Sequence, residues 1–200
     1  MPRNGQPTER RLERGDWVEL ALETLAQESV EAVLIVPLAK KLGVTKGSFY
    51  WHFKSREELL RAALDLWRTR ATKRVIEFVE AKSDDPETRL RQLFKIAVES
   101  KYKMPGGQIE IAVRDWARQD PIARKVVARV DNERLAYVAA LYRALGFDDM
   151  DAKTRALLQM SFSTGNGIVF GMSNKRERAE HVARCLELLL TPSVKASKKR

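Results

Sequence analysis

The chain of 200 residues is poor in the residues that build disulfides, metal sites and many active sites. Its single cysteine, Cys185, excludes an internal disulfide and a multi-cysteine zinc site. Its two histidines, His52 and His181, stand in no metal-binding spacing such as HExxH. The patterns of serine hydrolases, P-loop proteins and dinucleotide-binding proteins are also missing. We therefore expect neither an enzyme nor a protein that holds a metal or cofactor.

Long apolar runs are missing as well. No run approaches the roughly 18 residues that a membrane-spanning helix needs. The first residues contain no apolar segment of the kind found in a secretory signal. With 44% hydrophobic and 32% charged residues, the composition is typical of a folded, water-soluble chain. We expect a cytoplasmic protein without a membrane partner.

Acidic residues are fewer than basic residues. The chain has 37 Lys and Arg against 27 Asp and Glu, a net charge of +10. Such an excess indicates either a polyanionic partner or a solvated basic surface. The excess is spread over both halves of the chain, so the total does not locate a site. One stretch is more specific, because no acidic residue falls between Lys40 and Arg56, and four aromatic residues lie within it: Phe49, Tyr50, Trp51 and Phe53.

Helical periodicity is abundant. Apolar residues recur at the i, i+3, i+4, i+7 spacing of one helix face, as in Leu60, Ala63, Leu64 and Trp67. We predict an all-α fold of about nine helices. They cover residues 16–29, 37–43, 46–52, 55–81, 86–103, 108–118, 121–145, 152–172 and 175–190.

Helix start and stop signals agree with these ranges. Ser55 and Glu58 form the S-x-x-E pattern of a capping box, which opens a helix. Pro37 suits the first residue of a helix. Gly43 and Gly146 lie where a helix end favours a positive φ.

The lengths of the predicted helices divide the chain. The first three are short and closely linked, and the later ones are long. We expect an N-terminal module over residues 1–54, a larger helical domain over 55–190, and a basic, disordered tail over 191–200.

Within the module, two short helices joined by a tight turn form a helix-turn-helix over about residues 33–52. Ala39 is small enough for the second helix to cross closely, and Gly43 takes the positive φ of the turn. The hydroxyl of Thr45 is expected to cap the second helix. Phe49 and Phe53 are four residues apart, so they share the inner face of that helix.

The other face of the second helix suits a nucleic acid. Lys46, Gly47 and Ser48 lie at its N-terminus, where N–H groups favour phosphate and a glycine lets a DNA backbone approach. Tyr50 and Trp51 project outward, where they can pack on sugar or touch a thymine methyl group.

The stretch GVTKGSFYWHFKSREEL, residues 43–59, resembles the signature of the TetR family of bacterial transcriptional regulators. Arg56 stands where lysine is commoner, and Leu34 stands where a Ser or Thr usually begins the helix. The resemblance implies a homodimer on a palindromic double-stranded DNA operator, with the helix at 46–52 in the major groove. The residues implied to bind DNA are Thr45, Lys46, Gly47, Ser48, Tyr50, Trp51, His52 and Lys54.

The resemblance also implies a sequence-specific regulator, a repressor released by a small-molecule effector that shifts the two DNA-reading heads. The alternative is a helical ligand-binding or protein-interaction module in which the helix-turn-helix is only structural.

The C-terminal domain is expected to bind the effector and to form the dimer. Seven aromatic residues are candidates to line the pocket, although aromatics at helical spacing also form ordinary cores: Phe78, Phe94, Tyr102, Trp116, Tyr137, Phe162 and Phe170. Several glycines in the predicted helix 152–172 indicate either close approach across a two-fold interface or a kink that shapes a pocket. The residues predicted at the interface are Gly165, Val182, Cys185, Leu186 and Leu189.

Overall fold

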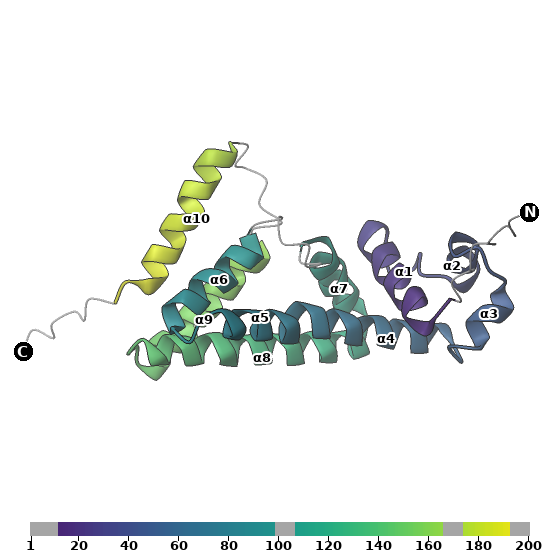
Figure 1. Cartoon of the computed structure of the whole chain (residues 1–200), viewed down its shortest axis with the longest axis horizontal. Helices are drawn as coiled ribbons and strands as arrows, with labels where there is room; N and C mark the ends of the chain where they lie inside the picture. Colours follow the sequence, from purple (N-terminus) through teal and green to yellow (C-terminus); the bar gives the residue numbers. More distant parts are fainter. Residues whose placement is uncertain (1–11, 99–106, 166–173, 193–200) are drawn as a thin grey trace, which may run out of the picture.

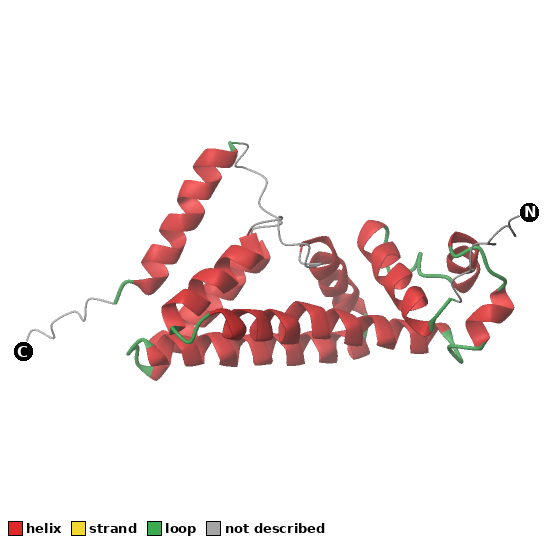
Figure 2. Cartoon of the chain, viewed as in Figure 1, coloured by secondary structure: helices red, strands yellow, loops and turns green. Residues whose placement is uncertain are grey.

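The computed structural model describes residues 12–98, 107–165 and 174–192, and these residues form helices and no strands (Figure 2). The helices of the N-terminal module are α1 (Arg14–Gln27), α2 (Ile35–Lys41) and α3 (Lys46–Tyr50). The remaining elements are α4 (Arg56–Arg68), η1 (Thr69–Lys73), α5 (Arg74–Lys82), α6 (Pro86–Val98), α7 (Gly107–Gln119), α8 (Pro121–Ala144), α9 (Asp149–Gly165) and α10 (Lys175–Leu190).

The all-α prediction is confirmed. The elements α4, η1 and α5 follow one another without a break, so the described residues form nine helical segments, as expected from the sequence. Figure 1 shows this long segment lying along α8, with the N-terminal module at one end of the molecule and α10 at the other. No helix among the described residues is long and apolar enough to cross a membrane.

The larger apolar core joins the N-terminal module to the rest of the chain. Trp17 of α1, Trp67 of α4, Val113 of α7 and Val130 of α8 are all fully buried within it. Burial of large side chains is the main stabilising contribution in such a core. The module is therefore held against α7 and α8 by apolar packing and not only by the chain connection.

A smaller core lies at the other end, where Leu90 of α6 and Tyr142 of α8 are fully buried. The hydroxyl of Tyr142 donates a 2.8 Å hydrogen bond to the amide oxygen of Gln159 on α9. Burial raises the pKa of Tyr142 to about 12, so the phenol stays protonated and remains a donor at neutral pH.

The helix boundaries follow the expected signals, with two corrections. Ser55 Oγ accepts a hydrogen bond from the Glu58 N–H at 3.3 Å, and Gly43 adopts a φ of +70°. Pro37, however, is the third residue of α2, since that helix begins at Ile35. Proline is tolerated there because the first N–H groups of a helix have no acceptor inside it. Thr45 precedes α3, but its hydroxyl forms no capping hydrogen bond.

The sequence pattern did not reveal the π-helical turn η1. A π turn leaves a backbone carbonyl without its usual helical donor. Here Arg134 of α8 donates to the Ala71 carbonyl at 3.1 Å and to Thr72 Oγ1 at 3.2 Å. In the same turn, Arg70 pairs with Glu19 of α1. The turn is thus anchored to α8 on one side and to the N-terminal module on the other.

Arg134 also belongs to a charge network between α7 and α8. Its Nη1 lies 2.9 Å from Glu110 Oε1, and Arg114 Nε lies 2.8 Å from the same oxygen. Arg114 in turn pairs with Asp131 at 2.6 Å. Burial works to raise the pKa of Glu110, but attraction to Arg134 and Arg114 outweighs it and holds that pKa below its ordinary value.

We predict that Glu110→Gln lowers the free energy of unfolding at pH 7 by about 3 kcal/mol, because it leaves two guanidinium groups without their shared carboxylate. Urea denaturation measures the change. A folded-state pKa below the unfolded value stabilises the protein above the unfolded pKa, and this contribution is lost as pH falls through the folded pKa. The variant should therefore lose less stability on acidification. Glu77→Gln, at an exposed position on α5, is the control and should change neither quantity.

Candidate nucleic-acid interface

The orientation of α3 is fixed by aromatic packing on its inner face. Phe49 is fully buried, and its ring centroid lies 5.3 Å from that of Trp17 in an edge-on arrangement. Phe53 stacks on Phe49 at 5.5 Å. Edge-on and offset pairs of this kind add to the stabilisation that burial alone gives. Because Phe49 can point only inward, the neighbouring residues of α3 must point outward.

The outward face is the one expected from the sequence. Trp51 is 89% exposed and Tyr50 is 52% exposed, which is unusual for large aromatic side chains. Ser48 and His52 are half-buried. Lys46 Nζ lies 5.9 Å from the centre of the Tyr50 ring. All eight residues predicted to bind DNA therefore lie on α3 or beside its two ends.

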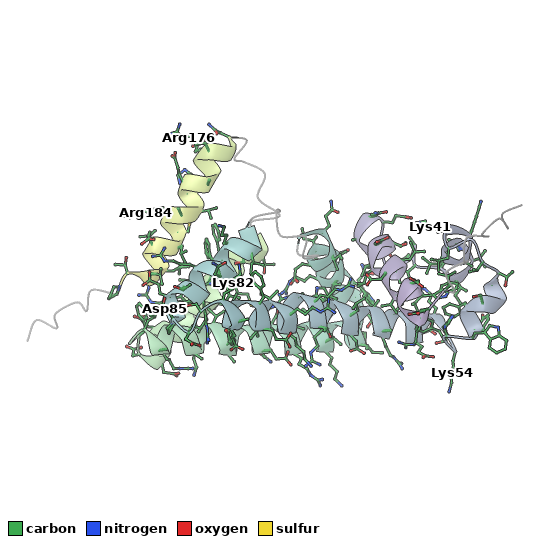
Figure 3. All side chains as sticks on the ribbon, viewed as in Figure 1. Lys41, Lys54, Lys82, Asp85, Arg176 and Arg184 are labelled. Carbon is green, nitrogen blue, oxygen red and sulfur yellow. The ribbon has the colours of Figure 1, made fainter. Side chains whose placement is uncertain are left out.

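The lysines of this face carry unneutralised charge. Among the described residues, no carboxylate forms an ion pair with Lys40, Lys46 or Lys54. Lys41 is different, because its Nζ lies 3.2 Å from Glu28. Figure 3 shows Lys54 extending away from the molecule at the end that carries α3. Unpaired lysines beside exposed aromatics suit a polyanion whose bases or sugars can also be packed upon.

Gly47 is not required by packing within the chain. A Cβ added at this position would meet only Thr45 Oγ1, at an ordinary distance of 3.5 Å. A glycine in a helix weakens it by roughly 0.5–1 kcal/mol relative to alanine. The bare backbone at this position therefore leaves space on the outer surface and serves no need of the fold.

Arg56 has a role that the sequence did not reveal. Its Nε donates to the Val33 carbonyl at 2.6 Å, and its Nη2 donates to the Val30 carbonyl. One side chain at the start of α4 thus holds the turn that leads into α2. Lysine, which is commoner at this position in the TetR signature, has a single nitrogen and lacks this forked geometry.

The first turn of α4 is held from α1 as well. Arg14 lies over the Phe53 ring at 4.4 Å and 3.5 Å from Glu58 Oε1. Glu58 Oε2 accepts a 2.8 Å hydrogen bond from the Lys54 N–H. The backbone of Lys54 is therefore fixed, although its side chain is exposed.

Comparison with known proteins identifies the module. Residues 18–63, from α1 to the middle of α4, match the N-terminal domain of the bacterial regulatory proteins of the tetR family. Residues 18–63 therefore form an N-terminal module of the TetR family. The matched segment contains the entire helix-turn-helix and the Arg56 contacts.

Individual relatives agree with this assignment. Over 83 residues, 42% of this chain and 39% of the relative, it is 29% identical to the HTH-type transcriptional regulator AcrR of Shigella flexneri. Over 91 residues, 44% of this chain and 43% of the relative, it is 32% identical to the HTH-type transcriptional repressor KstR2 of Mycobacterium tuberculosis. Each match therefore spans less than half of the curated relative.

The likeness in fold extends over most of the chain. A crystal structure of a transcriptional regulator from Rhodococcus sp. Rha1 superposes with a TM-score of 0.69, covers 90% of this chain and 94% of its own, and is 16% identical. The fold shared with this regulator thus extends beyond the matched N-terminal segment into the C-terminal helices.

The aromatic residues predicted for an effector pocket are spread over several environments. Phe94 and Phe162 stack on each other at 5.1 Å. Trp116 is 8% exposed and belongs to the larger core. Tyr137 packs on the smaller core, and Phe78 lies under Lys82 Nζ at 4.3 Å. The remaining two, Tyr102 and Phe170, lie outside the described residues.

The residues predicted for the dimer interface lie on α10, except Gly165, which is the last residue of α9. Leu186 is buried and Leu189 packs on the smaller core, so both already have contacts within the chain. Val182, Cys185 and Gly165 are half-buried.

Four exposed apolar residues on α9 and α10 are not among those predicted from the sequence. Leu157, Leu158 and Leu188 are all more than half exposed, and Met150 is 76% exposed. On α9 the spacing i, i+7, i+8 from Met150 to Leu157 and Leu158 is a helical-face signal that could have revealed them. Among the described residues, no group of three or more His, Cys, Asp or Glu side chains is placed to hold a metal ion.

We predict that Phe49→Ala and Trp51→Ala differ sharply in stability although they are two residues apart. Removing the buried Phe49 ring should cost about 3–5 kcal/mol, whereas truncating the exposed Trp51 should change the unfolding free energy by no more than about 0.5 kcal/mol. Equilibrium denaturation of both variants tests this. Similar losses would contradict the described rotation of α3.

Proposed function

We propose that the protein is a sequence-specific, DNA-binding transcriptional regulator that reads the major groove with α3. The observation that carries this proposal is the outer face of α3, where unpaired lysines flank two exposed aromatic rings on the second helix of a helix-turn-helix. A purely structural role of the motif would not explain why Trp51 is exposed. The relatives AcrR and KstR2 are named as transcriptional regulators, which supports the same function.

The proposed DNA contacts fall into two groups, those to phosphates and those to bases. Lys46 and Lys54 are placed to neutralise phosphates, and the Thr45 hydroxyl is available to one because it caps no helix. Gly47 lets the DNA backbone or a base edge approach closely. Trp51, the most exposed side chain of the face, contacts bases or thymine methyl groups and sets the sequence preference.

We further propose that two copies bind a palindromic operator, joined through α9 and α10. The exposed leucines of these two helices supply apolar area of the kind that a second copy covers. The C-terminal half of α10 is tied to the rest of the chain, because Arg91 pairs with Glu187 and Arg155 donates to the Leu189 carbonyl. Figure 1 shows the other end of α10 standing away from α6 and α9.

We also propose that the protein is a repressor that a small-molecule effector releases from DNA. An effector bound between the C-terminal helices would change the spacing of the two α3 helices and so weaken binding to a fixed pair of half-sites.

The DNA-binding proposal is tested by gel shift with DNA that flanks the protein's own gene. We expect sequence-selective binding that weakens as salt rises. Lys54→Ala should weaken binding to all DNA sequences and reduce the slope of log K against log salt by about one unit, because one phosphate contact is lost. Lys95→Ala, an exposed lysine on α6 with the same change of charge, is the control and should leave the slope unchanged.

Two outcomes of this experiment would count against the proposal. Absence of sequence-selective binding would favour a helical ligand-binding or interaction module with a structural helix-turn-helix. Equal effects of the Lys54 and Lys95 substitutions would mean that only the total charge of the chain attracts DNA.

The dimer is tested by placing charge in the apolar surface. We expect the unaltered chain to sediment as a dimer, and Leu158→Glu/Leu188→Glu to sediment as a monomer, because the interface would bury two carboxylates without partners. Ile122→Glu, at a 48% exposed position on α8, is the matched control and should stay dimeric. A double variant that remains dimeric would place the interface elsewhere.

A further inference from the structure

A cleft of about 470 Å³ lies between the N-terminal module and α7, away from the outer face of α3. Its walls come from the end of α1, the turn that follows it, the first turns of α4 and the C-terminal part of α7. Leu60 of α4 and Trp116 of α7 supply apolar surface. The volume falls within the range of sites that hold small molecules.

The cleft is acidic although the chain as a whole carries a net charge of +10. The carboxylates that line it include Glu31, Glu57, Asp115 and Asp120. Its one cationic lining residue, Arg56, already donates to two backbone carbonyls. A hydrogen bond from Ser29 lowers the pKa of Glu31, and one from Ser55 lowers that of Glu57, so both are ionised at neutral pH. These carboxylates therefore favour the binding of a cation in the cleft.

Trp116 adds an unused hydrogen-bond donor to the residues that line the cleft. Its side chain is more than nine-tenths buried, yet its indole N–H donates to no residue that the structure describes. This nitrogen is also not among the unsatisfied side-chain atoms that are sealed from solvent. A donor that is neither bonded nor sealed keeps some access to solvent, and Trp116 is one of the residues that line this cleft. An unused donor beside an apolar wall and a set of carboxylates is the pattern of a polar small-molecule site.

We propose that this cleft binds a small organic amine. The ammonium group lies among the carboxylates of Asp115 and Glu31, the apolar part lies on Leu60 and the Trp116 ring, and an oxygen of the ligand accepts from the indole N–H. A primary amine supplies three donors, which matches a wall of acceptors better than a metal ion that needs close ligation.

Because of the position of the cleft, we expect binding of the amine to change the affinity for DNA. This expectation rests on the proposed function. The ligand would touch α7 and the start of α4 together, next to the Arg56 contacts that hold the turn before α2. Binding would therefore fix the N-terminal module against α7 in one orientation and change the affinity for an operator.

The direct test is isothermal titration calorimetry of the full chain with 2-phenoxyethylamine, which carries an ammonium, an ether oxygen and a ring. The control ligand is 2-phenoxyethanol, which has a neutral hydroxyl group in place of the ammonium. A second ligand, 1,4-diaminobutane, has ammonium groups but no ring and tests the effect of charge alone. We expect the amine to bind more tightly than the alcohol, and we expect raised salt to weaken its binding. Equal affinity for amine and alcohol, or no binding by either amine, would overturn the proposal.

The location is tested with Glu31→Gln/Asp115→Asn. Both residues are exposed, and Asp115 forms no interaction with another described residue. Loss of the two carboxylates should weaken binding of the amine at least about fivefold. Glu77→Gln on α5 removes a carboxylate outside the cleft and should leave the affinity unchanged. An unchanged affinity in the double variant would also overturn the proposal.

These binding measurements do not depend on DNA, so they separate this site from the proposed function. Calorimetry that detects the amine while gel shift detects no operator binding would support the site and refute the regulator. Operator binding by a protein that binds no amine would support the regulator and refute the site.

Discussion

The burial of Phe49 between Trp17 and Phe53 is the contact on which the rest of the candidate site depends. It fixes the rotation of α3 about its axis, and the rotation decides which residues meet solvent. Trp51 is exposed because Phe49 is not. A nearly continuous run of aromatics is thus divided between the inside of the module and its surface, and the positive charge of the same stretch gathers on the surface side.

The module that carries α3 is joined to the rest of the chain at several points. Trp17 and Val113 share one apolar core, Arg70 of η1 pairs with Glu19 of α1, and Arg134 of α8 holds the same π turn. The division of the chain at residue 54 stays a prediction, whereas the core passes across it. A displacement of α7 or α8 would therefore be transmitted to α1 through packed side chains and ion pairs, which is the physical requirement for coupling between sites.

Much of the fold could be predicted from the sequence because helix signals are local. Periodicity located the nine helical segments, and the positive φ of Gly43 and Gly146 follows from turn chemistry. The two faces of α3 could be predicted for the same reason, since residues four apart share a side. The π turn could not, because its stabilising donor, Arg134, lies more than 60 residues away in the sequence.

Features that depend on tertiary contacts were the ones missed. The forked hydrogen bonds of Arg56 join residues that only the fold brings together, and the acidic cleft combines side chains from three separated segments. Helical spacing marks an apolar face on α10, but it does not reveal which members of that face are covered within the chain. Leu186 and Leu189 are covered, and Leu188 is left exposed.

The central claim is that two copies of α3 read one DNA site. The most direct measurement is selection of binding sequences from random double-stranded DNA by the full-length protein, followed by sequencing. We expect an inverted repeat whose half-sites are centred about one helical turn apart, or a multiple of that distance, in successive major grooves. Enrichment of no sequence, or of a sequence without two-fold symmetry, would contradict the claim.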